Sequence, residues 1–153
     1  MDLRDKVAII TGSGGGGTGR ATARLFAAKG AIVVVNDINE SGGRETVALI
    51  ESAGGRAVFS NADAGTENGI QNLFAFTELN FGGVDVLVNN ASSPDGLSRL
   101  TGWMECMRTE VLGPMQAILA AIEIMRRRGG GAIVNIGSTS ALGHGAKHSS
   151  WPS

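Results

Sequence analysis

The chain has 153 residues, of which 42% are apolar and 18% charged, and its formal net charge is −1. These values are ordinary for one soluble globular domain, and they provide no basic field for nucleic acid or an anionic membrane, so we expect neither partner. The single cysteine excludes an internal disulfide, and the sequence has no N-terminal signal or long apolar span, so a reduced, cytoplasmic location is the default expectation.

The first predicted strand, residues 6–11, leads into a glycine-rich turn and then into a helical pattern. The strand is short, apolar and β-branched, as is typical of a strand buried on both faces. Glycines in such a turn let the backbone approach a pyrophosphate, which then lies at a helix N-terminus. A flexible linker is the alternative, but the flanking strand and helix argue against it. The Gly-x-Gly-x-x-Gly spacing occurs twice, as Gly12, Gly14 and Gly17 and as Gly14, Gly16 and Gly19.

The second predicted strand, residues 31–36, ends at Asp37. A carboxylate at this position can accept both hydrogen bonds of an adenosine ribose diol, and it would repel the additional phosphate of NADP. The sequence therefore favours NAD over NADP. The alternative is that Asp37 only begins a turn or caps the next helix, predicted over residues 40–53.

Polar residues also follow the third and fourth predicted strands. The third strand, residues 56–60, leads to Asp63, and the fourth, residues 84–88, leads directly into Asn89 and Asn90. Ligands of open α/β sheets bind at the carboxyl ends of the strands, so we expect these side chains at the binding edge. The helix between the two strands has one apolar stripe, formed by Ile70, Leu73, Phe74, Thr77 and Phe81.

A long helix is predicted over residues 101–127, with a kink at Pro114. Its apolar residues occupy more than one face, which favours a homo-oligomer in which the second face meets a partner subunit. Cys106 lies within this helix without a neighbouring histidine, which favours a buried structural thiol over a nucleophile. The three arginines at 126–128 are interpreted as complementing the dipole at the helix end.

A fifth strand, residues 132–137, delivers Ser138 to the same edge. Five alternations of strand and helix predict an α/β fold with a doubly wound, Rossmann-type parallel sheet whose strand ends converge on one cleft. Residues 141–153 show no periodicity. They contain His144 and His148 at a four-residue spacing, but without a third ligand we expect no metal site.

The order of these motifs resembles the classical short-chain dehydrogenase/reductase family over essentially the whole chain. The motifs are the Thr-Gly glycine loop, the acids after strands two and three, Asn-Asn-Ala after strand four and Ile-Val-Asn-Ile-x-Ser on strand five. The asparagine pair distinguishes this pattern from methyltransferases, which share a glycine loop and an acid. The resemblance implies hydride transfer between NAD and a small alcohol or ketone, with Ser138 orienting the substrate oxygen. It also implies cofactor contacts at Gly12, Gly14, Gly17, Thr18, Gly19, Asp37, Ile38, Asp63, Ala64 and Asn90.

Four departures from the family pattern concern the site. Gly12 and Gly17 enclose four residues where the family has three, so the loop must bulge or use another glycine. The asparagine pair leads to Ser92 instead of glycine, and Glu110 occupies the position of the family's catalytic asparagine. The sequence also contains no tyrosine, although the family uses a tyrosine and a lysine for proton transfer. At the commonest spacing the tyrosine position falls on Trp151, which cannot act as a base.

A slightly longer loop would instead bring the tyrosine position just past Ser153, and we favour this interpretation. Residues 1–153 then form a single, C-terminally incomplete NAD(P)-binding domain, with two further strands and the substrate lid missing. The fifth strand would be an exposed apolar edge, which predicts aggregation or partial disorder of the isolated chain. Two other hypotheses stay open: a dinucleotide-binding module without catalysis, and a structural fragment without a ligand.

Overall fold

The computed structural model describes residues 2–93 and 100–138, so His144, His148 and Trp151 lie outside the described part of the chain. Strands and helices alternate along the described residues, as the sequence pattern predicts. In chain order the elements are β1 (Val7–Thr11), α1 (Thr18–Ala28), β2 (Ile32–Asn36), α2 (Glu40–Ser52), β3 (Arg56–Ser60), α3 (Glu67–Phe81), β4 (Val86–Asn89), α4 (Leu100–Cys106), η1 (Met107–Leu112), α5 (Gly113–Arg127) and β5 (Ala132–Asn135).

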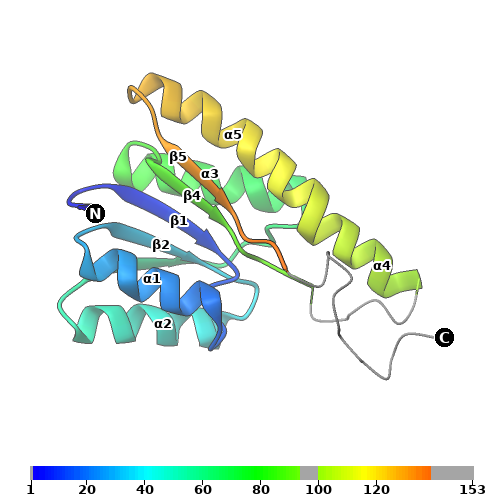
Figure 1. Cartoon of the computed structure of the whole chain (residues 1–153), viewed down its shortest axis with the longest axis horizontal. Helices are drawn as coiled ribbons and strands as arrows, with labels where there is room; N and C mark the ends of the chain where they lie inside the picture. The colour runs from blue at the N-terminus through cyan, green and yellow to red at the C-terminus, as the bar shows by residue number, and fades with distance from the viewer. Residues whose placement is uncertain (1, 94–99, 139–153) are drawn as a thin grey trace.

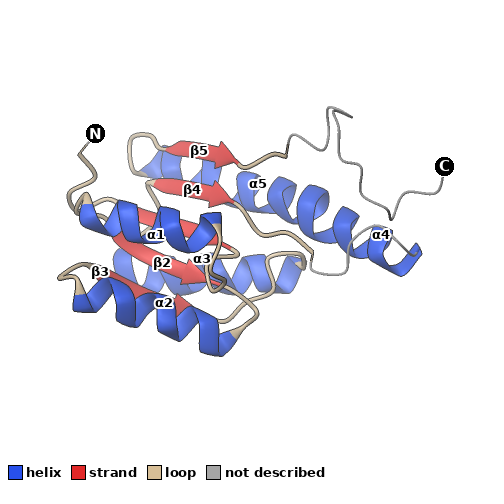
Figure 2. Ribbon diagram, turned by 60° about the horizontal axis from the view of Figure 1, so that its bottom comes forward, coloured by secondary structure: helices blue, strands red, loops and turns tan. Residues whose placement is uncertain are grey.

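The five strands form one sheet in the order β3-β2-β1-β4-β5, and every neighbouring pair is parallel. Helices α1 and α2 cover one face of the sheet, and α3 and α5 cover the other (Figures 1 and 2). The predicted doubly wound, Rossmann-type sheet is therefore confirmed. Because β2 and β4 lie on opposite sides of β1, the chain changes direction across the sheet at the β1/β4 pair, and the carboxyl ends of these two strands border a crevice.

The core has two layers because successive strand residues point to opposite faces of the sheet. On one face, Ile9 packs with Leu73 of α3 and Ile124 of α5. On the other face, Ile10 packs in a cluster with Ala23 of α1. Strands β1, β2 and β4 are thus buried on both faces, which explains their continuous apolar sequences.

At the amino ends of the strands, Asp85 ties three elements together. Its carboxylate accepts the Val7 backbone N–H at 2.9 Å and the Arg128 Nη2–H at 3.1 Å, and Lys6 Nζ lies 3.8 Å away. Burial raises the pKa of Asp85, but the hydrogen bonds from Val7 and Arg128 and the positive charges of Arg128 and Lys6 outweigh it. The pKa is therefore held below its ordinary value.

The long helix predicted over residues 101–127 is three helical segments in the structure. α4 is followed by the π-helical η1, in which the Gly113 N–H donates to the Arg108 carbonyl, and then by α5. Pro114, which has no backbone N–H to donate, lies in the first turn of α5, directly after η1. The expected kink is thus replaced by a change of hydrogen-bond register ahead of the proline, and the segments continue as one rod in Figure 1. Cys106, expected to be buried, is half-buried.

Two apolar surfaces remain exposed. Strand β5 is an edge strand in which Val134 is 42% exposed, as the sequence pattern predicts. The rod of α4, η1 and α5 exposes a longer series of apolar side chains: Leu100, Trp103, Met104, Met107, Val111, Leu112, Met115 and Leu119. Within the described residues, no helix combines the length and apolarity that a membrane crossing requires.

Candidate functional site

A cleft of about 710 Å³ opens at the carboxyl ends of the strands. This volume is typical of small-molecule and cofactor sites. Of the predicted cofactor residues, only Gly14 is absent from its walls. The cleft is lined by Gly12, Gly17, Thr18, Gly19, Asp37, Ile38, Asp63, Ala64 and Asn90 among others.

The glycine-rich turn contains positions where the fold itself requires glycine. Gly12 has a φ of +63°, a backbone conformation that other residues rarely adopt. A Cβ at Gly14 would lie 2.9 Å from the Asp37 side chain, and a Cβ at Gly19 would collide with the Gly12 carbonyl. The Gly14 N–H donates to Asp37 Oδ2 at 2.7 Å, so the close approach fastens the loop to the end of β2.

Gly15, Gly16 and Gly17 are different, because neither sterics nor backbone conformation requires glycine there. A Cβ at any of them would meet nothing within 4 Å, and none of the three has a positive φ. We call this open stretch, Gly15 to Gly17, the glycine cradle; Gly15 and Gly17 line the cleft. Gly17 is also the N-cap of α1, and no side chain caps this helix, so the positive end of the helix dipole lies at the cradle. The arrangement fits a phosphate or pyrophosphate.

Asp37 stands beside this cradle. Its Oδ2 accepts from Gly14, and its Oδ1 accepts from the Asn39 N–H at 2.9 Å. A carboxylate has about four acceptor positions, so each oxygen can still accept one hydroxyl of a ribose diol. Ile38, 64% exposed, follows it on the cleft wall.

The asparagines at the end of β4 form hydrogen bonds to neighbouring elements that the sequence did not predict. Asn90 Nδ2 donates to the carbonyls of Thr11 at 2.9 Å and Gly12 at 3.0 Å, which ties the end of β4 to the glycine loop. Asn89 Nδ2 donates to Asn135 Oδ1 at 2.8 Å and joins β4 to β5 in the same way. These amides brace the carboxyl edge of the sheet around the cleft.

An ion-pair network that the sequence analysis missed lines the cleft at Asp63. Arg108 Nη1 lies 2.7 Å from Asp63 Oδ2, and Arg108 Nη2 lies 2.6 Å from Glu105 Oε2. The hydrogen bonds from Arg108 to Glu105 and Asp63 hold the pKa of the guanidinium above its usual range. The three-residue spacing of Glu105 and Arg108 on a helix could have predicted their ion pair. The ion pair of Arg108 with Asp63, 45 residues away, could not be predicted from spacing.

Ser138 lines a second cavity, of about 620 Å³, which shares Asn90, Ala91 and Ser92 with the first. Two of the departures from the family pattern, Ser92 and Glu110, are hydrogen-bonded to each other here. Glu110 Oε1 accepts from the Ser92 hydroxyl at 2.8 Å and from the Ser93 N–H at 3.2 Å. Glu110, at the position where the family has an asparagine, therefore binds the loop that follows β4. In residues 2–93 and 100–138, no three histidine, cysteine, aspartate or glutamate side chains gather to hold a metal ion.

Comparison with known proteins agrees with this geometry. The family model described as short chain dehydrogenase matches residues 6–152. The chain belongs to the short-chain dehydrogenase/reductase family. An uncharacterized oxidoreductase of Thermotoga maritima is 40% identical over 146 residues, which cover 93% of this chain and 57% of the relative. A 3beta-hydroxysteroid dehydrogenase 1 of Eggerthella lenta is 37% identical over 147 residues, which cover 92% of this chain and 56% of the relative.

Solved structures of the family share the fold. A 7 alpha-hydroxysteroid dehydrogenase complexed with NADH and 7-oxo glycochenodeoxycholic acid superposes with a TM-score of 0.83 at 30% identity, over 97% of this chain and 59% of that one. A hydroxysteroid dehydrogenase from Escherichia coli gives a TM-score of 0.81 at 34% identity, over 90% of this chain and 56% of that one. This short-chain dehydrogenase/reductase thus spans little more than half the length of the relatives it matches.

Proposed function

We propose that this chain is the cofactor-binding portion of an NAD-dependent oxidoreductase that acts on a small alcohol or ketone. The observation that carries the proposal is the open cradle of Gly15, Gly16 and Gly17 at the uncapped N-terminus of α1. Glycines that the fold does not require, beside a row of backbone donors, suit a bound pyrophosphate. Asp37 at the end of β2 supports NAD over NADP, because a 2′-phosphate would face its carboxylate.

Each predicted contact then has a role. Gly12, Gly17 and Gly19 surround the pyrophosphate at the cradle, and Asp37 accepts the hydroxyls of the adenosine ribose. Asp63 and Ala64 meet the adenine at the far end, and Asn90 holds the floor beneath the nicotinamide half. A bound nicotinamide supplies hydride transfer. Ser138 lines the second cavity and would orient the substrate oxygen there. The two cavities share Asn90, Ala91 and Ser92 as lining residues.

A fluorescence titration tests this function and its cofactor preference. The chain is expected to bind NADH saturably and at least tenfold more tightly than NADPH, since close like charges oppose the 2′-phosphate. Asp37→Ser is expected to reduce or remove this preference. Equal binding of NADH and NADPH by the unaltered chain would contradict the assignment to NAD. No binding of either would contradict the proposed function.

A dinucleotide-binding module without turnover is the second candidate. It is favoured by Glu110, which occupies the position of the family's catalytic asparagine and is hydrogen-bonded to the Ser92 loop. The two candidates differ in what an additional C-terminal segment does. Turnover restored by such a segment supports the oxidoreductase, and binding without turnover supports the module.

A further inference from the structure

The adenine end of the cleft is built around Asp63, a residue on the loop after β3. Its Oδ1 accepts the Gly65 N–H at 2.9 Å, a local contact within the same loop. Its side chain is 39% exposed, so this single local bond would leave the carboxylate free to turn about its terminal torsion. A second anchor comes from a different element, because Arg108 of η1 donates to Oδ2 at 2.7 Å.

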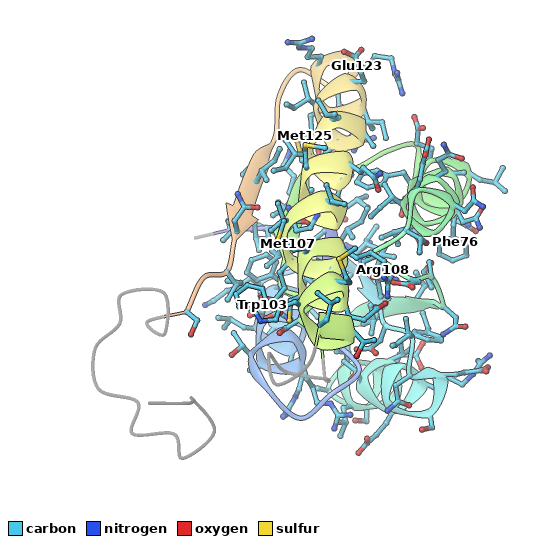
Figure 3. All side chains as sticks on the ribbon, turned by 90° about the vertical axis from the view of Figure 1, so that its right-hand side faces the viewer. Phe76, Trp103, Met107, Arg108, Glu123 and Met125 are labelled. Atoms are coloured by element: carbon cyan, nitrogen blue, oxygen red, sulfur yellow. The ribbon has the colours of Figure 1, made fainter. Side chains whose placement is uncertain are left out.

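Arg108 is itself held in place. Its Nε and Nη2 both donate to Glu105 Oε2, at 2.9 and 2.6 Å, while Nη1 reaches Asp63. Two edges of the planar guanidinium are thus engaged by carboxylates, which fixes its orientation. Gly65 leaves the room for this contact, since a Cβ there would lie 2.6 Å from Arg108 Nη1. Figure 3 shows Arg108 leaving the helix on a different side from Trp103.

The network leaves Asp63 usable as an acceptor. Each carboxylate oxygen accepts one hydrogen bond from the protein and keeps a further acceptor position. The carboxylate, Arg108 and Glu105 all line the same cleft, so the fixed oxygens border the space that a ligand would enter. Fixing an acceptor before binding removes an ordering cost from the binding step.

We propose that Arg108 is a positioning residue for purine recognition, which orients the Asp63 carboxylate to accept the exocyclic amino group of adenine. The inference rests on the proposed function. It explains why an arginine on the α4/η1 rod is directed into the cleft while its neighbours Met104, Met107 and Val111 are exposed. Its consequence is selectivity for a purine that carries an amino group over one that carries an oxo group, because an oxo group presents only acceptor lone pairs to the carboxylate.

The test compares NADH with reduced nicotinamide hypoxanthine dinucleotide, in which an oxo group replaces the adenine amino group. The unaltered chain is expected to bind NADH about tenfold more tightly, since one charge-assisted hydrogen bond is at stake. Arg108→Met is expected to bring the two affinities within about twofold of each other, because the carboxylate is no longer oriented. Arg108→Lys should recover part of the difference. Arg127→Met is the matched control: it removes an exposed helical arginine paired with Glu78 and should leave the ratio unchanged.

A double-mutant cycle shows whether Arg108 acts through Asp63. Asp63→Asn alone should also abolish the selectivity, because an amide can donate to the oxo group. The double variant should then lose nothing further. The proposal is overturned if Arg108→Met keeps the selectivity, if it tightens NADH binding, or if the unaltered chain has no selectivity. Failure of the unaltered chain to bind either dinucleotide would instead overturn the proposed function.

Discussion

Replacing Gly15 by alanine separates what the glycine cradle does for the fold from what it does for a ligand. A Cβ at this position meets nothing within 4 Å, and its φ is not positive, so alanine fits without strain. The substitution restricts the unfolded chain and should raise the free energy of unfolding by about 0.4–1 kcal/mol. For a chain of this length that corresponds to an increase in Tm of about 1–4 °C.

The same methyl group projects from a residue that lines the cleft. If it displaces one charge-assisted hydrogen bond between the backbone and a phosphate, binding loses about 1.5–3 kcal/mol, or at least tenfold in the Kd of NADH. We therefore predict a more stable chain that binds the cofactor less well.

Thermal unfolding followed by circular dichroism and NADH fluorescence titration measure the two effects on the same sample. Gly54→Ala is the control with the opposite outcome. Gly54 has a φ of +80° at the end of α2, outside the cleft walls, so alanine should destabilise the fold and leave NADH affinity unchanged. If Gly15→Ala binds NADH as tightly as the unaltered chain, or is destabilised like Gly54→Ala, the cradle is not a phosphate site of the kind we describe.

Two further predictions concern stability and assembly. Asp85→Asn should lower the free energy of unfolding by about 2 kcal/mol at neutral pH, because Arg128 loses a buried partner. Because the pKa of folded Asp85 lies below its unfolded value near 4, this contribution is present above about pH 4 and is lost as the pH falls through the folded pKa. Urea titrations at several pH values check this, and Asp5→Asn, which alters an exposed pair, should change little. Sedimentation should show a homo-oligomer that Leu119→Lys, at a position 62% exposed, converts to a monomer. A monomeric unaltered chain would refute the predicted oligomer.

The sheet and most helix boundaries were predictable because they follow from local signals. Buried parallel strands are continuous apolar runs, and the helices between them end at glycines. The π-helical η1 was not predictable from the periodicity, which fits a continuous helix through residues 101–127. The contact at the start of α5 was not predictable either: a Cβ on Gly113 would collide with the Ala64 carbonyl, so α5 begins against the loop after β3.

The same limit applies to close packing between elements. Gly42 and Gly43 weaken α2 as a local sequence, yet a Cβ on Gly43 would collide with the Phe59 ring. Gly43 therefore allows α2 to pack against β3, and Gly42 allows it to approach the Gly14 carbonyl of the glycine-rich turn. Such approaches depend on residues far apart in the chain, and helical periodicity does not reveal them.

In the candidate site, the residues at strand ends were predictable and the cross-element contacts were not. Asp37, Asp63 and Asn90 follow buried strands, and parallel topology alone brings them to one edge. Arg108 lies in a helical segment whose sequence pattern was explained by its apolar residues, so no polar contact was predicted for it. Its contact with Asp63 joins η1 to the loop after β3, 45 residues away in the sequence. Glu110 was recognised as a departure, but its hydrogen bond to Ser92 required the structure.

The most direct test of the account is to follow the backbone amide resonances of the ¹⁵N-labelled chain as NADH is added. Binding of NADH in the cleft should give saturable shifts at Gly15, Gly16, Gly17 and Thr18, together with Asp37 and Asp63, with a single Kd for all of them. Shifts confined to other parts of the chain, or none at saturating NADH, would contradict a dinucleotide site at the crevice between β1 and β4.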